Sequence, residues 1–438
     1  MVKKINVLFI YIGILLVMLS CSSPEAQPDE KIAEEGIRVR KPPKGCDVID
    51  SIDEFNESTG DQSYNMDIDA DRNFNKTATG VTDAGETLYA VCDGDWFIYC
   101  DKKTGNSGLL CGNPECDHTN KECNAYMKDC WGTQYYEGYL YTVQDIDGFK
   151  LKKVSTDGTE REDLGKLTAT DVIISRDTGG CSIDWIIHRG YIYYLYNWDA
   201  GWTEDIYYLN NSNCIYRRSL EKDSKPECIT ALPVLSWWAE CRLIGEGSYI
   251  YILMPTADQE TDCYLYRYNI ETEKLEWFKE WGNNICGVAV HDNKIYYLER
   301  DRAAKKFKMY CYNLETKEKN ILFETKGISA GMSHDDDYIY IANMLEDETW
   351  RREVWNWDGR YLTDIEINPT RRFDDEGRRR GLAGSDNERI YISCISGNEE
   401  IYGIHIMGYA LVIEYIEKED ILDGEYEIKE WSEMADNR

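Results

Sequence analysis

The chain has few of the residues on which many catalytic and nucleic-acid-binding sites depend. It contains only 5 histidines and 9 prolines among 438 residues, and 49 Lys and Arg stand against 81 Asp and Glu, a net charge of −32. A chain this acidic repels the phosphate backbone of nucleic acids and the surface of anionic lipids. The composition therefore argues against a nucleic-acid partner and against electrostatic binding to a membrane.

Common catalytic motifs are scarce as well. The sequence contains no P-loop, no dinucleotide-binding G-x-G-x-x-G and no H-E-x-x-H of a zinc protease. The histidines are scattered, and the acidic residues are too many to single out a carboxylate pair for glycoside hydrolysis. This scarcity favours binding over catalysis, and we predict no catalytic residue. The alternative is an extracellular hydrolase or lyase with acidic residues in the centre of the fold.

The only long apolar run lies at the N-terminus. Lys3 and Lys4 precede the apolar run 5–19, and the small residue Ser20 precedes Cys21. This arrangement is typical of a signal peptide, because the run is too short to span a membrane. The cysteine after a small residue resembles the lipobox of bacterial lipoproteins. We expect a signal peptide over 1–21, acylation of Cys21 and export to the outer face of a bacterial membrane; ordinary secretion is the alternative.

The composition divides the rest of the chain into three parts. Residues 22–62 are rich in Pro, Ser and charge, which predicts a flexible tether. Residues 63–432 carry most of the 33 Tyr and 13 Trp, and residues 433–438 form a short C-terminal tail. Aromatic residues favour strands, and about 370 residues exceed a usual single core unless the fold is a repeat.

A short pattern recurs through this folded part. A turn with Gly, Asp or Asn is followed by an aliphatic residue, a tyrosine and an apolar strand, at intervals of about 44 to 58 residues. Such a period is typical of propeller blades. The tyrosines of the pattern are Tyr89, Tyr141, Tyr193, Tyr251, Tyr296, Tyr340 and Tyr391.

Each unit also has a second turn between two alternating strands. Thr104-Gly105, Asp157-Gly158 and Asp358-Gly359 are hairpin signals, and Met407-Gly408 is a weaker one. Four antiparallel strands repeated seven times predict an all-β, seven-bladed propeller. The third unit lacks a tight second turn, so six or eight blades remain alternatives.

The tyrosine-rich units resemble the exported TolB-like and WD40-like β-propeller lipoproteins of anaerobic bacteria. The resemblance covers about residues 63–432 and rests on the G-x-x-I-Y-Y pattern and on the stretch LLCGNPECDHTNKECNAY. It implies the fold and an envelope location. It implies no activity, because the family has no agreed one.

That cysteine-rich stretch is the strongest local signal for a ligand. It places Cys111, Cys116, His118 and Cys123 within thirteen residues, and three thiolates with one imidazole form a recognised structural zinc set. Two alternatives to a zinc site stay open: disulfides, and reduced, buried thiols that behave as small hydrophobic residues. One or two disulfides, with Cys130 as a further partner, suit an exported protein, and fifteen cysteines besides Cys21 leave at least one unpaired.

A weaker signal for a metal precedes the first repeat. Asp67, Asp69, Asp71 and Asn73 alternate like the start of a calcium loop. Arg72 and Ala78 stand where such a loop needs glycine and a bidentate carboxylate, so a solvated acidic segment is expected instead.

The remaining candidates are tryptophans in long loops. The loops joining strand two to strand three, and one blade to the next, share one face of a propeller and carry function because the blades hold them. Exposed Trp beside charge suits a glycan, a peptide or an envelope protein as partner. The residues predicted to bind it are Trp198, Trp202, Trp350, Arg371 and Arg372.

Overall fold

The computed structural model describes residues 46–49, 63–65, 67–70, 81–92 and 95–431. Within the last range it leaves out 119–121, 146–148, 168–180, 199–213, 232–241, 257–258, 279–284, 302–305, 326–329, 345–349, 366–377, 398–399, 402–403 and 406–408. Residues 42–438 form one compact unit, and residues 1–41 form another that lies outside the described part. No helix in the described part has the length and apolar composition needed to cross a membrane.

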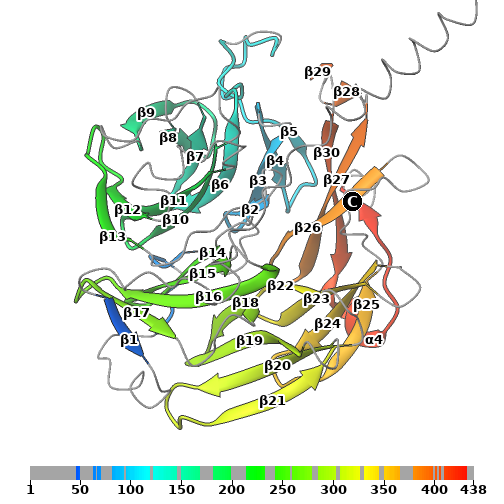
Figure 1. The fold of residues 1–438 in the computed structure, drawn as a ribbon. Helices are drawn as coiled ribbons and strands as arrows, with labels where there is room; N and C mark the ends of the chain where they lie inside the picture. The colour runs from blue at the N-terminus through cyan, green and yellow to red at the C-terminus, as the bar shows by residue number, and fades with distance from the viewer. Residues whose placement is uncertain are drawn as a thin grey trace, which may run out of the picture. The chain divides into compact units, whose positions relative to one another are not determined.

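Seven four-stranded antiparallel sheets follow one another along the chain and form a ring of blades (Figure 1). Blade 1 comprises β2 (Val81–Asp83), β3 (Thr87–Cys92), β4 (Trp96–Asp101) and β5 (Ser107–Leu109). Blade 2 comprises β6 (Cys130–Tyr136), β7 (Tyr139–Gln144), β8 (Lys150–Ser155) and β9 (Arg161–Lys166). Blade 3 comprises β10 (Cys181–His188), β11 (Tyr191–Trp198), β12 (Cys214–Ser219) and β13 (Glu227–Ala231).

The other four blades repeat this order. Blade 4 comprises β14 (Arg242–Glu246), β15 (Tyr249–Thr256), β16 (Gln259–Asn269) and β17 (Lys274–Phe278); blade 5 comprises β18 (Ile285–His291), β19 (Lys294–Asp301), β20 (Lys306–Asn313) and β21 (Lys319–Glu324). Blade 6 comprises β22 (Ala330–His334), β23 (Tyr338–Met344), β24 (Trp350–Asn356) and β25 (Tyr361–Ile365). Blade 7 comprises β26 (Arg378–Ser385), β27 (Arg389–Gly397), β30 (Tyr409–Glu417) and β31 (Lys429–Glu430).

The prediction of a seven-bladed propeller is confirmed, and the alternatives of six or eight blades are wrong. Each recurring tyrosine lies in the second strand of its blade, and the aliphatic residue before it has no exposed surface. These residues are Leu88, Leu140, Ile192, Ile250, Ile295, Ile339 and Ile390. The pattern repeats because each blade must bury the same strand between its two neighbours.

First strands of neighbouring blades contact one another from blade 7 through blade 1 and on to blade 6, so they form the inner layer of the ring. The ring closes where blade 1 meets blade 7, through a cluster that contains Leu88, Ala383 and Tyr391. The Lys102 ammonium reinforces this junction, because it lies 2.9 Å from Asp83 in blade 1 and 2.7 Å from Asp386 in blade 7.

Four features differ from the sequence-based expectations. Strand β1 (Cys46–Ile49) lies inside the segment expected to be a tether and pairs in parallel with β17, from Cys46 opposite Leu275 to Ile49 opposite Phe278. Blade 7 has a small hairpin, β28 (Glu400–Ile401) and β29 (Ile404–His405), before β30. Its last turn contains helix α4 (Lys418–Asp423), so Met407-Gly408 is not that turn. Blade 3 is a complete blade, because its insertion falls between β11 and β12.

The acidic segment before blade 1 is also not simply solvated. Asp69 is buried and accepts hydrogen bonds from the amides of Asn65 and Gly247 and from Nε of Arg189. Its carboxylate is therefore committed to holding this segment against blades 3 and 4. Asp67 is exposed, and Asp71 and Asn73 lie outside the described residues.

Candidate metal centre

The cysteine-rich segment connects β5 of blade 1 to β6 of blade 2. Its second half adds backbone hydrogen bonds to blade 1: the Phe97 amide donates to the Ala125 carbonyl at 2.9 Å, and the Met127 amide donates to the Asp95 carbonyl at 2.7 Å. The Tyr126 ring meets the Trp96 ring edge-on, with centroids 4.9 Å apart. Blade 1 thus fixes residues 125–127.

Blade 2 holds the same segment from the other side. Arg161, the first residue of β9, donates from Nη1 to the carbonyls of Cys123 at 3.1 Å and Tyr126 at 2.7 Å. The Gly112 amide donates to the Gly158 carbonyl at 3.0 Å, and a Cβ on Gly112 would come within 2.4 Å of Thr159. Only glycine permits this approach, so the chain just after Cys111 is anchored on the Asp157-Gly158 turn.

Between these anchors the structure brings four potential metal ligands together. The thiols of Cys111, Cys116 and Cys123 and a ring nitrogen of His118 all lie within 4.8 Å of one another. Cys123 is buried and the other three are half-buried. In a tetrahedral zinc site with Zn–S bonds of about 2.3 Å, sulfur atoms lie about 3.8 Å apart. The donors are therefore arranged at nearly the separation that zinc requires.

The thiols of this cluster differ in their acidity. Burial raises the pKa of Cys111, but hydrogen bonds from the amides of Asn113 and Asn124, then from the thiols of Cys123 and Cys116, outweigh it and hold the pKa below its usual value. Burial raises the pKa of Cys123 to about 12, with the neighbouring thiols of Cys116 and Cys111 adding to the shift. The protein environment alone thus makes the Cys111 thiol more acidic than the Cys123 thiol.

The disulfide alternative has less support from the geometry. Cys111, Cys116, Cys123 and Cys130 are all free thiols in the structure. Cys130 begins β6 and is buried with Val91, Phe97 and Leu140, in a core cluster between blades 1 and 2. It is not one of the four grouped donors.

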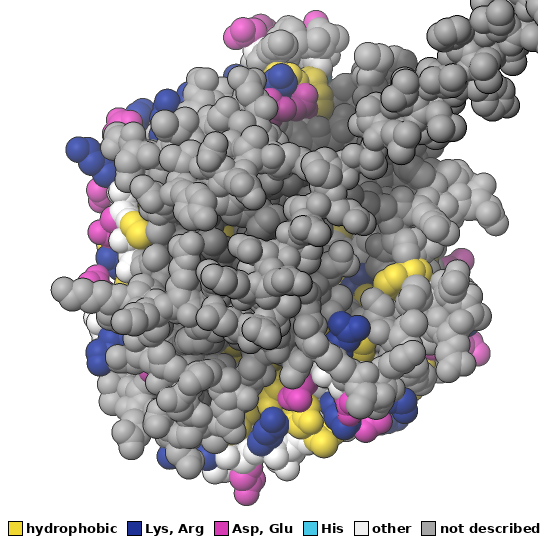
Figure 2. Space-filling view, viewed as in Figure 1, with side chains coloured by type: hydrophobic (Ala, Val, Ile, Leu, Met, Phe, Trp, Pro, Cys, Tyr) yellow, Lys and Arg dark blue, Asp and Glu magenta, His cyan; other side chains and the backbone are white. Residues whose placement is uncertain are grey.

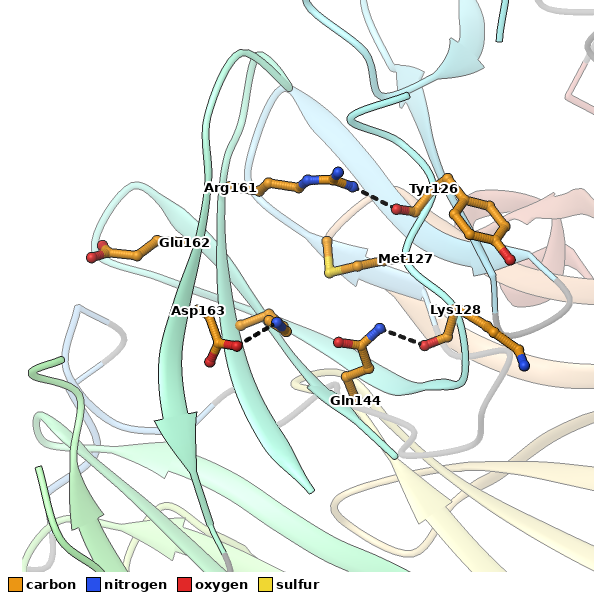
Figure 3. Close-up of a pocket in the computed structure, with 8 residues that line it drawn as sticks. Tyr126, Met127, Lys128, Gln144, Arg161, Glu162 and Asp163 are labelled. Atoms are coloured by element: carbon orange, nitrogen blue, oxygen red, sulfur yellow. Dashed lines mark hydrogen bonds and ion pairs between the residues drawn. The ribbon is translucent and has the colours of Figure 1, made fainter. Parts of the chain in front are cut away.

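A pocket of about 480 Å³ opens beside the cysteine-rich segment (Figure 3). One wall is formed by Tyr126, Met127 and Lys128 at the end of the cysteine-rich segment, and the other by strands β7 to β9. In Figure 3, Arg161 reaches across the top of the pocket to the Tyr126 carbonyl, and Gln144 bonds the Lys128 carbonyl at 2.8 Å. The pocket exists because the segment is held in this position.

Most of the residues predicted to bind a partner cannot be placed. Trp202, Arg371 and Arg372 lie outside the described residues, and Trp198 ends β11 with a side chain that is not described. Trp350 begins β24 and is half-buried. The structure therefore leaves their grouping as a prediction. By contrast, no local sequence pattern indicated Arg161 as a clamp, since its acceptors are carbonyls 35 and 38 residues away.

Ser329 lies in a sequence motif that resembles the nucleophile motif of some hydrolases. Gly327-Ile328-Ser329-Ala330-Gly331 matches G-x-S-x-G, the pattern of the nucleophile elbow of α/β-hydrolases. In that elbow the serine follows a strand and precedes a helix. Here strand β22 begins at Ala330, directly after the serine, so the context of an elbow is missing.

Known proteins match this chain in structure but not in sequence. No family model and no curated protein matches the sequence. Among solved structures, a prolyl endopeptidase has a TM-score of 0.48 and 12% identity over 82% of this chain and 50% of its own. An oligogalacturonate lyase from Vibrio parahaemolyticus has a TM-score of 0.46 and 12% identity, and the match covers 79% of this chain and 90% of the lyase. A puromycin hydrolase has a TM-score of 0.46 and 9% identity, and the match covers 85% of this chain and 56% of the hydrolase. This chain spans about half the length of the two hydrolases. Similarity at this level assigns no activity to this chain.

Proposed function

We propose that this chain is a binding module in which a structural zinc ion fastens the junction of blades 1 and 2. The observation that carries the proposal is the grouping of three thiols and one imidazole within 4.8 Å. A donor set of three cysteines and one histidine favours zinc over harder ions such as calcium and magnesium. Four protein ligands leave no open position on a tetrahedral ion, so the site stabilises structure and performs no hydrolysis.

The position of the site supports a structural role. Cys111 follows blade 1 directly, while the Cys123 carbonyl is bonded by Arg161 of blade 2. A metal ion would connect the two ends of a segment that has little apolar area of its own, since residues 112–115 are exposed. Ligand binding that occurs only in the folded state adds its free energy to stability. The ion would thus hold the wall of the neighbouring pocket in place.

The wider role that we propose is recognition of a glycan, a peptide or an envelope protein by a protein anchored through Cys21. Two features support this role. The ring of blades is a rigid scaffold. The long connections with Trp198, Trp202 and Trp350 follow second strands, which end on the same side of the blades as the cysteine-rich segment begins. Membrane attachment would come from the lipid alone.

Cobalt substitution tests the metal site. Tetrahedral cobalt bound by thiolates absorbs visible light, so the protein reconstituted with one equivalent of Co²⁺ should turn blue-green and lose the colour when zinc is added. Cys116→Ser should weaken or abolish the absorption, whereas Cys228→Ser, at an exposed cysteine in β13 outside the cluster, should leave it unchanged. A colourless wild-type protein with reduced thiols would refute the zinc site.

Retention on immobilised envelope glycans and peptides tests the recognition role. The double change Trp198→Ala and Trp202→Ala should abolish retention and leave the thermal midpoint nearly unchanged. A variant that unfolds would assign both tryptophans to the core. Turnover of a polysaccharide or a peptide by the wild-type protein would contradict a function limited to binding.

A further inference from the structure

Two guanidinium groups from different blades meet at the innermost strand of blade 6. Arg242, the first residue of β14, donates from Nη1 to the carbonyl of Met332 in β22. Arg352 in β24 donates from Nη1 to the hydroxyl of Ser333 at 3.0 Å. Since Met332 and Ser333 are consecutive residues of β22, the two cations converge on one short piece of backbone.

Arg352 is buried without a carboxylate. Only 9% of its surface is exposed, and its Nε has no hydrogen-bond partner. Other buried arginines are better satisfied: Arg267 lies 2.6 Å from Glu276, and Arg218 donates to three backbone carbonyls. Within the described residues, no acid lies at ion-pair distance from Arg352 or Arg242.

Positive charge thus predominates around Arg352, whereas the chain as a whole carries a net negative charge. Burial, and then the positive charge of Arg242, lower the pKa of Arg352 to about 10, yet it remains charged at neutral pH. Around the rim seen in Figure 2, in contrast, Lys and Arg side chains lie among Asp and Glu. A buried cation beside a second cation is costly unless an anion accompanies it.

Open space lies on the same face of blade 6 as the Arg352 side chain. The strand register aligns Gly331, Ala342 and Arg352 on one face of blade 6, and Ser333 lies on the same face two residues further along β22. A Cβ on Gly331 would meet no atom within 4 Å. Gly331 and Ser333 are half-buried, so solvent reaches this edge.

The neighbouring blade adds one described acid to this face, the buried Glu414 of β30, which lies in register with Ile392 and forms no ion pair with Arg352 or Arg242. Tyr340 and Val354 of the same face pack against Leu382 and Ile390 of blade 7. The inner strand of blade 7, β26, begins with Arg378, Arg379 and Arg380. The backbone thus places three further arginines at the start of the adjacent strand.

We propose that this place is a binding site for a small oxyanion, a carboxylate or a phosphate group, held by Arg352 and Arg242 together with the Ser333 hydroxyl. A guanidinium group offers paired N–H donors that match two oxygens of either anion. The free Nε of Arg352 supplies a donor that is otherwise unsatisfied. The site is separate from the metal centre, which lies between blades 1 and 2.

Calorimetric titration of the zinc-loaded mature protein tests the site, with inorganic phosphate in one arm and acetate in the other, at an ionic strength kept constant with chloride. At least one anion should bind with one site per chain. Arg352→Met should weaken this binding at least about tenfold and Arg242→Gln several-fold, since charge-assisted pairs are lost. Arg351→Gln is the matched control, because Arg351 lies on the opposite face beside Asp364, and should change affinity less than about twofold.

Thermal unfolding separates binding from a purely structural role. Without anion, Arg352→Met should be at least as stable as the wild type, because an unpaired buried charge is removed, and phosphate or acetate should no longer raise its midpoint. Gly331→Ala, which fills the open space, should keep the wild-type midpoint and lower the affinity. No binding of either anion to the wild type, or equal binding by Arg352→Met, would overturn the proposal.

Discussion

The Nδ1 atom of His118 lies 3.3 Å from the Sγ atom of Cys123. Five residues separate them in sequence, and the backbone reaches this geometry with a left-handed conformation at His118, where φ is 56°. Histidine is among the residues that tolerate that conformation better than most. The contact connects the exposed end of the loop to its buried end, which blades 1 and 2 both hold.

This contact predicts how the imidazole can be replaced. His118→Ala should reduce zinc affinity by at least about tenfold, because three ligands remain, whereas His118→Cys should retain one zinc through a fourth thiolate. Competition with a chromophoric chelator measures both affinities. Equal affinity of His118→Ala and the wild type would remove His118 from the site.

Removal of the metal should loosen the segment that forms the pocket wall. Hydrogen exchange at the amides of Tyr126 and Met127 should become much faster after chelation, while exchange at Tyr296 in blade 5 should stay unchanged. Mass spectrometry of peptic fragments follows both regions. Uniform protection before and after chelation would show that blades 1 and 2 hold the segment without a metal.

The junction of blades 1 and 7 should depend on one cation. Lys102→Ala leaves Asp83 and Asp386 as neighbouring, largely buried carboxylates, so we expect a loss of about 2–4 kcal/mol in the free energy of unfolding. Lys152→Ala, which leaves the half-exposed Asp163, should cost less than about 1 kcal/mol. Urea denaturation compares the two variants, and similar losses would contradict the assignment of ring closure to Lys102.

Buried His188 should make the protein sensitive to mild acid. Its Nδ1 accepts from the Ala70 amide, its Nε2 donates to the Gly247 carbonyl, and burial lowers its pKa to about 4 from the usual 6.5. The unfolded chain therefore takes up a proton that the folded protein does not. The stability from His188 is complete above pH 6.5 and is lost as the pH falls towards 4, by at most about 3 kcal/mol.

The variant His188→Gln isolates this effect from the many carboxylates. The difference in unfolding free energy between the wild type and His188→Gln should shrink between pH 6.5 and pH 4. A difference that stays constant would mean that His188 is protonated in the folded protein or does not titrate in this range.

The sequence predicted the blades because each one repeats the same local requirement. An aliphatic residue and a tyrosine in the second strand face two neighbouring blades, and a hairpin turn must precede them. In blades 6 and 7 the turn residues Asp335 and Asp386 cap the turn amides and also accept from the hydroxyls of Tyr340 and Tyr391. The recurrence of acidic turns before this tyrosine therefore has a direct structural cause.

Contacts between distant residues were not predictable from local patterns. Asp69 is buried because Arg189 and Gly247 lie around it, and they follow it by 120 and 178 residues. Strand β1 has only four residues in a segment of tether-like composition, and it is fixed by pairing with β17. The four metal ligands were predictable because they lie within thirteen residues, but the clamp from Arg161 was not.

The lipid anchor remains a prediction from the sequence. Mass spectrometry of the mature N-terminus should find Cys21 as the first residue with attached acyl chains, because a signal peptide and a small residue precede it. Cys21→Ser should release the protein into the medium. An unmodified Cys21 in the mature wild-type protein would contradict the anchor.

Metal analysis of the mature protein, purified without chelators, tests the central claim most directly. We predict one zinc per chain in the wild type and in Cys228→Ser, and markedly less than one in Cys116→Ser. Zinc at background level in the wild type, together with disulfide-bonded Cys111, Cys116 or Cys123 in the denatured, unreduced chain, would contradict the account.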